Sequence, residues 1–306
     1  MTGVDIGVGL DSRLGLRHEE LRDLAREAAR LGYASVWTPS VTDDPFRLCA
    51  EWWHATGLRT GISVMPLSVA GEPPALAKAA AAVAEFTGGR FILGVGSGAR
   101  REVAFVRARL AAVRAELAGR LPVYLGALGP RMLRLAGEGA DGVALNWCAP
   151  EQVAWSRERV AEGAREAGRD PRAAIPVAEY IRVCVDEDEH AARAALSLAL
   201  LAYALARPGI PRRFGYRAHF ARMGFDAALT ELEARRDRGA SPEELADAFP
   251  VELLGRVGYA GPAAGASEAF RRLAAGLDVA IVRVVAARPG VEPALAAIRA
   301  CAPSAR

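Results

Sequence analysis

Two glycine-rich segments of the chain have the composition of ligand-binding loops. The sequence GVGSG at 94–98 ends a β-branched run, and its three glycines would let the backbone approach a flat ligand or a phosphate closely. The second segment, LGALGP at 125–130, runs into a helical stretch, so the free N–H groups from Ala127 to Gly129 and the helix dipole would face an anion. Either segment alone could be an ordinary turn. Together they predict one wall and one anion seat of a binding site.

Acidic side chains near the ends of other β-branched runs could move a proton. Asp11 and Asp43 follow the first two runs, and Glu179 with Tyr180 lies less favourably within a later run. A carboxyl group held within hydrogen-bond reach of a substrate can act as a general acid. The pair Asp43-Asp44 has a competing structural use, because it precedes Pro45 in the manner of a helix cap. We predict Asp11 and Asp43 as the catalytic candidates.

Cysteine and histidine form no cluster that suggests a metal site or a nucleophile. The four cysteines lie far apart, without a CxxC pair or a zinc-type spacing, so no metal is predicted and the thiols are expected in the core. The four histidines fall in expected helices or at their starts without a Ser or Cys partner motif, which disfavours nucleophilic hydrolysis. These residues are Cys49, Cys148, Cys184, Cys301, His18, His54, His190 and His219.

Two kinds of segment alternate along the chain and would position the candidate residues. Short β-branched runs, most of them apolar on both faces, are typical of parallel strands covered by helices, and each precedes a longer segment with helical periodicity. The expected strands are 4–9, 35–39, 61–65, 91–96, 122–126, 142–146, 176–185 and 279–285. The expected helices are 19–31, 45–56, 74–86, 102–118, 131–138, 151–167, 189–206 and 293–301.

Eight strand–helix pairs predict one α/β domain over 1–306, folded as a (β/α)8 TIM barrel. A doubly wound open sheet is the alternative. In a barrel the carboxyl ends of the strands carry the site, which would bring 94–98 and 127–129 together. A helical stretch at about 207–258 interrupts the pattern and predicts an insertion after the seventh strand. Its arginine and aromatic residues are equally consistent with two roles. They could form a solvated cap or dimer surface, or they could bind an anionic group.

Composition narrows the class of protein. Hydrophobic residues at 52% and charged residues at 25% of the 306 exclude wholesale disorder. A net charge of +3 is too balanced for a broad basic face, so a small-molecule ligand is expected and nucleic acid is not. The chain shows neither a basic segment leading into an apolar run nor an apolar stretch of about 18 residues, which predicts a cytoplasmic protein without a membrane span.

Three stretches of the sequence resemble the luciferase-like flavin and deazaflavin oxidoreductases. They are AREAARLGYASVWTPS at 25–40, FTGGRFILGVGSG at 86–98 and PVYLGALGPRMLRLAGEGADGVALNW at 122–147. The subgroup that the chain resembles contains the methylenetetrahydromethanopterin reductase that uses coenzyme F-420. The resemblance implies a (β/α)8 barrel whose strand ends hold a reduced deazaflavin or flavin, in a homodimer that acts on a small-molecule or peptide substrate.

The resemblance also implies which residues contact the coenzyme. Such proteins commonly carry a non-proline cis peptide that forms a bulge behind the ring, which here falls in the third expected strand. The end of the fourth strand would lie along the ring or its ribityl chain, and the start of the fifth helix would hold the phosphate. An Asn-Trp pair follows the sixth strand, with rim packing as an equal alternative for the tryptophan. The implied residues are Ser63, Val64, Gly96, Ser97, Gly98, Ala127, Leu128, Gly129, Asn146 and Trp147.

Two departures from the resemblance leave alternatives open. Only residues 99–121 separate the fourth and fifth strands, where relatives usually carry a longer cover, so the pocket should be open to a bulky substrate. The end of the second strand, WTPSVTDD at 37–44, has no histidine. We predict an F-420-dependent reductase that transfers a hydride to a C=C or C=N bond, with Trp52 and Trp53 suited to a dimer face. An FMN-dependent monooxygenase and a non-catalytic coenzyme-binding homologue are the alternatives.

Overall fold

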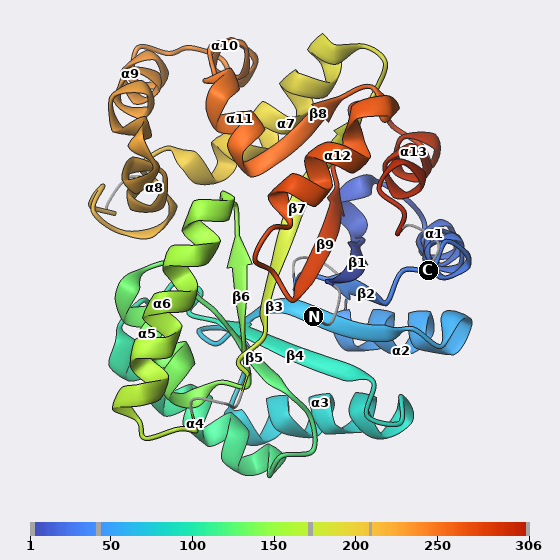
Figure 1. Ribbon diagram of the computed structural model, residues 1–306, viewed down its shortest axis with the longest axis vertical. Coiled ribbons are helices and arrows are strands. Elements are labelled where there is room, and N and C mark those ends of the chain that lie inside the picture. The colour runs from blue at the N-terminus through green and yellow to red at the C-terminus, as the bar shows by residue number, and fades with distance from the viewer. Residues whose placement is uncertain (1–3, 41–43, 171–173, 208–209, 304–306) are drawn as a thin grey trace.

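Eight parallel strands in the described part of the chain close into a barrel (Figure 1). The computed structural model describes residues 4–40, 44–170, 174–207 and 210–303. Strands β1 to β7 pair in chain order, and β9 pairs with both β7 and β1. The predicted TIM barrel is confirmed, and the open sheet is wrong because no barrel strand is left with one neighbour. The barrel strands are β1 (Asp5–Gly9), β2 (Ser35–Thr38), β3 (Arg59–Pro66), β4 (Phe91–Gly96), β5 (Val123–Gly126), β6 (Gly142–Asn146), β7 (Val177–Val185) and β9 (Val279–Val284).

Helices surround the barrel, and their ends follow local signals in the sequence (Figure 1). The second begins where Asp44 accepts hydrogen bonds from the backbone N–H groups of Phe46 and Arg47, with Pro45 in the first turn. It ends at Gly57, whose φ of 69° lies in the left-handed region that glycine adopts without strain. The outer helices that follow the barrel strands are α1 (His18–Arg30), α2 (Pro45–Thr56), α3 (Pro73–Phe86), α4 (Val103–Leu117), α5 (Pro130–Gly139), α6 (Pro150–Glu166), α7 (Glu189–Ala204) and α13 (Glu292–Ala300).

Large side chains fill the inside of the barrel, as expected for eight strands. This inner cluster consists of Trp37, Ile92, Tyr124, Ala178, Tyr180, Val279 and Ile281. Glycines on neighbouring strands make room for the rings: a Cβ on Gly61, the register partner of Trp37, would lie 2.4 Å from the Trp37 ring. A second, larger apolar layer packs the outer faces of the strands against the helices. The rigid floor beneath the carboxyl ends of the strands is therefore built from apolar and aromatic packing.

One strand and one helix in the last quarter of the chain were not predicted. Strand β8 (Gly258–Gly261) pairs with the second half of β7, in the register Arg182 to Gly258, and helix α12 (Ala263–Leu273) follows it. The first half of β7 pairs with β6 instead. The sequence of β8, GYAG, lacks the β-branched residues that mark a strand, so only its partner β7 reveals it. Strand β7 thus extends beyond the barrel at its carboxyl end.

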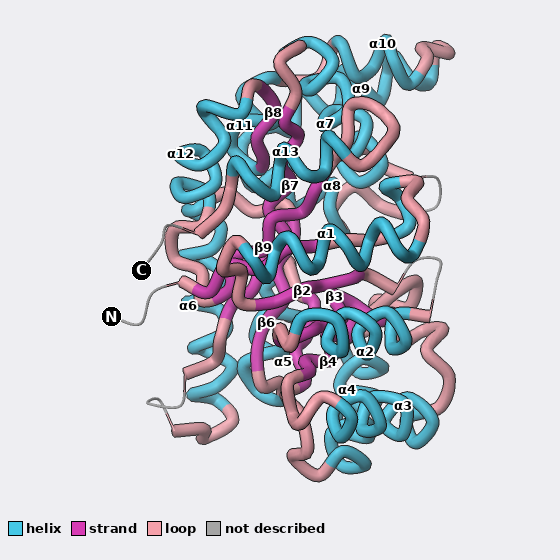
Figure 2. The backbone as a smooth tube through the Cα atoms, turned by 90° about the vertical axis from the view of Figure 1, so that its right-hand side faces the viewer, coloured by secondary structure: helices cyan, strands magenta, loops and turns pink. Residues whose placement is uncertain are grey.

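The described residues of the stretch expected as an insertion form four helices and a π-helical turn between α7 and β8. Figures 1 and 2 show these helices gathered at one end of the molecule. They pack on α7 through an apolar cluster of their own that includes Leu200, Phe220, Leu229 and Leu253. The elements are α8 (Gly215–Phe220), η2 (Ala221–Phe225), α9 (Asp226–Asp237), α10 (Pro242–Asp247) and α11 (Val251–Val257).

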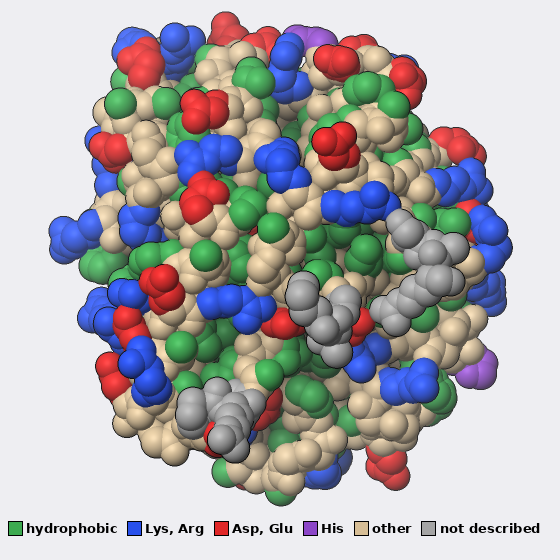
Figure 3. Space-filling view, viewed as in Figure 1, with side chains coloured by type: hydrophobic (Ala, Val, Ile, Leu, Met, Phe, Trp, Pro, Cys, Tyr) green, Lys and Arg blue, Asp and Glu red, His purple; other side chains and the backbone are tan. Residues whose placement is uncertain are grey.

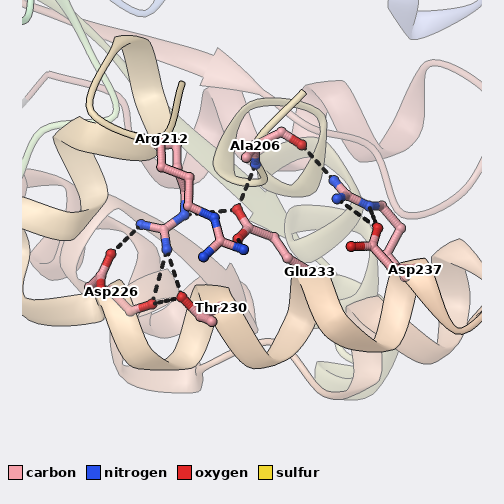
Figure 4. Close-up of polar contacts among 8 residues, drawn as sticks. Ala206, Arg212, Asp226, Thr230, Glu233 and Asp237 are labelled. Atoms are coloured by element: carbon pink, nitrogen blue, oxygen red, sulfur yellow. Dashed lines mark hydrogen bonds and ion pairs between the residues drawn. The ribbon is translucent and has the colours of Figure 1, made fainter. Parts of the chain in front are cut away.

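A buried carboxylate ties this helical region together (Figure 4). Glu233 is 0% exposed and accepts hydrogen bonds from the Ala206 backbone N–H at 2.7 Å and from Nε of Arg217 at 2.8 Å. Arg212 pairs with its second oxygen at 2.7 Å. Arg217, itself buried, also binds Asp226 at 2.8 Å. These two arginines, which the sequence left open between a cap and an anion seat, therefore hold α8 and the preceding loop onto α9.

The outer surface contrasts with the site described below. Figure 3 shows basic and acidic side chains interspersed over the face in view, without a large patch of one sign. Within the described residues, no helix is long and apolar enough to cross a membrane.

Candidate active site at the carboxyl ends of the strands

A cavity of about 640 Å³ opens where the strands end, as the barrel fold predicts. Its lining comes from the ends of β2 to β7, the start of α5, the end of α7 and the insertion helix α8. The two glycine-rich segments lie side by side in it, because β4 pairs with β5 in the register Val95 to Leu125. The predicted juxtaposition of 94–98 and 127–129 is thus present in the structure.

The wall beside β4 is built around Val64. The bond between Ser63 and Val64 is cis, as the resemblance implied. The Val64 side chain lies against the glycines of the next strands: a Cβ on Gly96 would lie 2.7 Å from Cγ2 of Val64, and one on Gly126 would lie 3.2 Å from Cγ1. Side chains at these positions would displace Val64 or fill the cavity. The glycines therefore leave a smooth apolar wall that suits a flat ring.

The start of α5 forms the candidate anion seat beside this wall. Gly129 is its N-cap residue and Pro130 occupies the first turn, and no described side chain caps this end. The Ala127 N–H donates to the Ala144 carbonyl at 3.2 Å, so the N–H groups that remain for an anion are those of Leu128, Gly129 and the turn after Pro130. A Cβ on Gly129 would meet nothing within 4 Å, which indicates open space. Arg222 reaches this loop from the insertion, with its Nη2 donating to the Leu128 carbonyl at 3.0 Å. An anion seated here would meet both the helix dipole and a guanidinium.

Nine of the ten residues expected to contact a coenzyme line the cavity, and their contact with it stays a prediction. They are Ser63, Val64, Gly96, Ser97, Gly98, Ala127, Leu128, Gly129 and Asn146. Trp147 does not line it. Its ring is 0% exposed and packs beneath the Arg182 guanidinium, whose Cζ lies 4.0 Å from the ring centre. Of the two interpretations weighed for Trp147, the structure supports packing, so its placement among the coenzyme contacts is corrected.

The two predicted proton donors are not among the described lining residues. Asp11 is buried, accepts from Nε of Arg13 at 2.9 Å and forms an ion pair with Arg283. Burial acts to raise the pKa of Asp11, but the Arg283 charge and the bonds from Arg13 outweigh it and lower the pKa below its ordinary value. An ionised, paired carboxylate is a poor general acid, which corrects the prediction for Asp11. Asp43 lies outside the described residues.

Glu179 and Tyr180 point to opposite sides of β7. Oε1 of Glu179 accepts from the Cys148 backbone N–H at 2.6 Å, away from the cavity lining, and burial raises its pKa to about 8. Tyr180 faces the cavity, and its buried Oη has no hydrogen-bond partner among the described residues. Two residues on, Arg182 faces the same way. The inward side of β7 thus supplies polar groups that the sequence analysis underrated.

The inner end of the cavity is an arginine–tyrosine cluster, which we define as Arg13, Tyr180, Arg182, Tyr203 and Tyr216. Arg182 is only 5% exposed and donates to the Tyr180 carbonyl at 3.1 Å and to Oδ1 of Asn146. The Asn146 amide in turn donates to Oη of Tyr216 at 2.6 Å. Two charged residues, Glu179 and Arg182, within the buried strand VAEYIRVCV were the sequence signal that pointed here.

The tyrosines of this cluster differ in acidity. Burial acts to raise the pKa of Tyr203, but the charges of Arg182 and Arg13 outweigh it and lower the pKa below its ordinary value. Burial raises the pKa of Tyr216 to about 12 and also raises the pKa of Tyr180. Burial lowers the pKa of Arg182 to about 10, which leaves it charged at neutral pH. Tyr203 is therefore the most acidic phenol in the cluster.

A tether links the insertion to the end of β6. The buried ring of His219 lies with Nε2 2.8 Å from the Trp147 carbonyl and 3.9 Å from Sγ of Cys148. Burial lowers the pKa of His219 to about 4 and raises the pKa of the Cys148 thiol, so both groups are neutral at physiological pH. A neutral thiol buried beside a neutral imidazole is no nucleophile. The contact serves to seat α8 against the cavity.

Residues 5–106 and 100–279 match the family described as luciferase-like monooxygenase. The chain belongs to this family. It is 32% identical over 149 residues to the 5,10-methylenetetrahydromethanopterin reductase of Methanolobus tindarius, a match that covers 38% of this chain and 45% of the relative. It is 27% identical over 288 residues to a putative coenzyme F-420-dependent oxidoreductase of Mycobacterium tuberculosis, covering 78% and 81% of the two chains. The first match therefore spans less than half of the relative's length.

Solved structures of luciferase-like proteins share the fold. The coenzyme F-420-dependent tetrahydromethanopterin reductase of Methanopyrus kandleri superposes with a TM-score of 0.73 at 20% identity, covering 98% of both chains. An F-420-dependent secondary alcohol dehydrogenase gives 0.69 at 18% identity, again over 98% of both. The FMN-bound oxygenating constituent of 3,6-diketocamphane monooxygenase from Pseudomonas putida gives 0.58 at 14%, covering 97% and 95%. Deazaflavin and flavin enzymes are thus both represented among the neighbours.

Proposed function

We propose that this luciferase-like barrel is a coenzyme F-420-dependent reductase that transfers a hydride between reduced deazaflavin and a C=C or C=N bond of a substrate that can be bulky. One observation carries the proposal. A smooth wall made by Val64 and the glycines of β4 and β5 adjoins an anion seat at the start of α5, within one cavity. A flat ring joined to a phosphate needs this combination of surfaces.

The residues present fit a deazaflavin with a long anionic tail. The ring would lie against Val64 and Gly96, and the phosphate would lie at 127–129 beside Arg222. Further arginines at the same cavity, Arg131 and Arg213, exceed what one phosphate needs and would meet the carboxylates of the tail. When bound, the reduced coenzyme supplies the hydride. The protein's part is to orient the ring, hold the acceptor against it and provide a proton.

An FMN-dependent monooxygenase is the second candidate, because the seat at 127–129 would hold the FMN phosphate equally well and an FMN-bound neighbour shares the fold. Two features favour the deazaflavin. Several arginines line the cavity beyond the phosphate seat. Helix α4 also begins soon after Gly98, so the cover that would shield an oxygen adduct from water is short.

Titration with F-420 and with FMN, each oxidised and reduced, tests the proposal through quenching of the protein's tryptophan fluorescence, since the reduced coenzymes themselves barely fluoresce. We expect F-420 to bind more tightly, and Arg222→Gln to weaken its binding about tenfold through loss of a charged hydrogen-bond donor. Arg26→Gln is the matched control, since Arg26 pairs with Asp23 on the exposed side of α1. Tighter binding of FMN in both redox states would favour the monooxygenase. Tight binding of F-420 without oxidation by any unsaturated acceptor would favour a non-catalytic homologue.

We further propose that the chain acts in the cytoplasm as a homodimer on a small-molecule or peptide substrate, without nucleic acid or membrane partners. The dimer face expected at Trp52 is revised, because Trp52 is buried in the core. Trp53 instead meets the exposed ring of Phe86 edge to face at 5.3 Å, which leaves an apolar patch on α2 and α3. Sedimentation of wild type and Phe86→Glu tests this, and an unchanged dimer in the variant would rule the patch out.

A further inference from the structure

The charged groups that line the cavity within the described residues all have one sign. They are Arg13, Arg101, Arg131, Arg182, Arg213 and Arg222, and no described Asp, Glu, His or Cys lines it. The other four arginines adjoin the proposed seat of the coenzyme tail. The inner pair, Arg13 and Arg182, lies in the arginine–tyrosine cluster, where no coenzyme phosphate is placed.

The inner guanidiniums have too few counter-charges among the described residues. Arg13, Arg182 and Arg283 act together on Tyr203, and Asp11 is the carboxylate that pairs with Arg13 and Arg283. The partners of Arg182 are a carbonyl and an amide oxygen, which carry no net charge. Glu179 lies on the other face of β7 and keeps its proton at neutral pH. A buried guanidinium without a carboxylate is costly, so a ligand that brings negative charge would be favoured here.

A second observation at the same place points to a ligand. The Oη of Tyr180 belongs to a side chain that is 4% exposed, lines the cavity and has no hydrogen-bond partner among the described residues. Buried hydroxyl groups are normally satisfied, so this donor is available for an oxygen atom of a bound molecule. With Arg182 beside it, the cluster presents two buried donors to one part of the cavity.

We propose that the arginine–tyrosine cluster stabilises an oxyanion on the substrate, that the reducible bond is a C=C conjugated to a carbonyl or carboxyl oxygen, and that Tyr203 is the proton donor. This inference rests on the proposed function and narrows its substrate class. The alternative acceptor, a protonated C=N, brings positive charge to a cavity lined by six arginines and is disfavoured by repulsion.

The hydride forms a new C–H bond at the β-carbon, and the electron pair of the C=C bond moves to the α-carbon and its conjugated oxygen. Arg182 and Oη of Tyr180 face that oxygen as its charge develops. The O–H bond of Tyr203 breaks as its proton goes to the α-carbon. The resulting phenolate lies beside Arg13 and regains a proton from water. The reduced coenzyme, when bound, would supply the hydride and its two electrons.

Tyr203 is singled out by position as well as acidity. It is partly exposed in the cavity, so water can return its proton, and its ring packs edge to face on Tyr216 at 4.8 Å. Oη of Tyr216 is engaged with Asn146, and Tyr180 lies deeper. The groups that face Tyr203 come from four elements: Arg13 from the turn after β1, Arg182 from β7, Arg283 from β9 and Tyr216 from α8.

The first test uses the coenzyme-free protein and 4-nitrophenol, whose phenolate absorbs differently from its neutral form. We expect binding as the phenolate with a lowered pKa, and about 10-fold weaker binding in Tyr180→Phe and in Arg182→Met, which remove the two proposed oxyanion donors. Tyr259→Phe is the control, since Tyr259 lies on β8, outside the cavity, and its hydroxyl donates to the Pro262 carbonyl. Binding of neutral nitrophenol only, no binding, or equally tight binding of N-methylpyridinium would overturn the oxyanion site.

The second test measures a single turnover of reduced F-420 with 2-cyclohexen-1-one and with protonated 3,4-dihydroisoquinoline. We expect oxidation by the enone, slowed about 10²- to 10⁴-fold in Tyr203→Phe with the coenzyme affinity unchanged. Faster oxidation of reduced F-420 by the iminium than by the enone would overturn the inference. It would also be overturned if Tyr203→Phe still reduced the enone while Asp43→Asn, Tyr180→Phe or Tyr216→Phe did not. Nitrophenolate binding without F-420 binding would refute the proposed function alone, whereas F-420 binding without nitrophenolate binding would refute this inference alone.

Discussion

Replacing Glu233 by Gln should loosen the helical region that supplies one wall of the cavity. The substitution keeps the size of the side chain but removes its charge, while the buried Arg217 still lies 2.8 Å from Oε1. Arg217 is 3% exposed, so water cannot replace the lost carboxylate. Arg212 is 54% exposed on the same carboxylate and loses little, because solvent screens it.

The size of the effect follows from these contacts. Two unit charges about 4 Å apart interact by about 4 kcal/mol at an effective dielectric constant of about 20. Breaking a buried pair by removing one partner typically costs about 3–5 kcal/mol. The retained hydrogen bond from the Ala206 N–H and the bond of Arg217 to Asp226 offset part of this loss. We expect the free energy for opening the helices at 215–257 to fall by about 3 kcal/mol.

Hydrogen–deuterium exchange with peptide mapping measures this opening directly. Exchange in α8 and α9 should accelerate while exchange in β1 to β5 stays unchanged, because the barrel has its own core. Glu231→Gln is the matched control on the same helix, since Glu231 forms exposed pairs with Arg235 and Arg238. Equal exchange in the two variants would refute the reasoning that the buried pair holds the insertion.

Three further predictions concern the fold and the site. Gly137→Ala should destabilise the α5–α6 crossing by about 1–3 kcal/mol, since the new Cβ would lie 2.0 Å from the Val160 carbonyl oxygen. Gly139→Ala is the control, because its Cβ would meet nothing closer than 3.8 Å, and urea unfolding distinguishes the two variants. Gly96→Ala should weaken F-420 binding with the fold intact, measured by fluorescence and circular dichroism, and unchanged affinity would contradict the assigned wall. His219, with its pKa lowered to about 4, stays neutral in the fold while the unfolded chain takes up a proton below about pH 6.5, so it contributes a loss of stability of about 1.4 kcal/mol per pH unit as pH falls from about 6.5 to 4. Glu179, with its pKa raised to about 8, acts in the opposite direction above about pH 4.5, so the measurement is the difference in stability between wild type and His219→Gln in urea titrations, and a difference that does not change with pH would contradict the prediction.

The barrel could be predicted from the sequence because its signals are local. Runs such as FILGVG carry β-branched residues and end at glycines, and Asp44-Pro45 marks a helix start without reference to the rest of the chain. Strand β8 escaped prediction because GYAG has no strand character of its own and pairs only because β7 continues past the barrel. Its existence depends on a partner distant in the sequence.

The same distinction between local signals and contacts over long sequence distances applies to the site. The glycine-rich loops were visible because spacing of small residues is itself the signal. The arginine–tyrosine cluster was not, because Arg13, Arg182 and Tyr203 come from three elements and become neighbours only in three dimensions. The prediction for Asp11 relied on a local signal, its position after β1, which suits a catalyst. Its ion pair with Arg283 could not be predicted, because it depends on strand β9 at the other end of the chain.

Helix α8 docks onto the end of β6 through His219. The barrel and the inserted helices thus have separate apolar cores and separate roles. The barrel fixes the ring-binding wall, whereas Tyr216 and Arg222 reach the same chamber from a segment inserted late in the chain. Exchange of that segment would alter which molecules are accepted while leaving the redox apparatus in place. Substrate preference in such proteins can therefore change during evolution through replacement of the inserted helices alone.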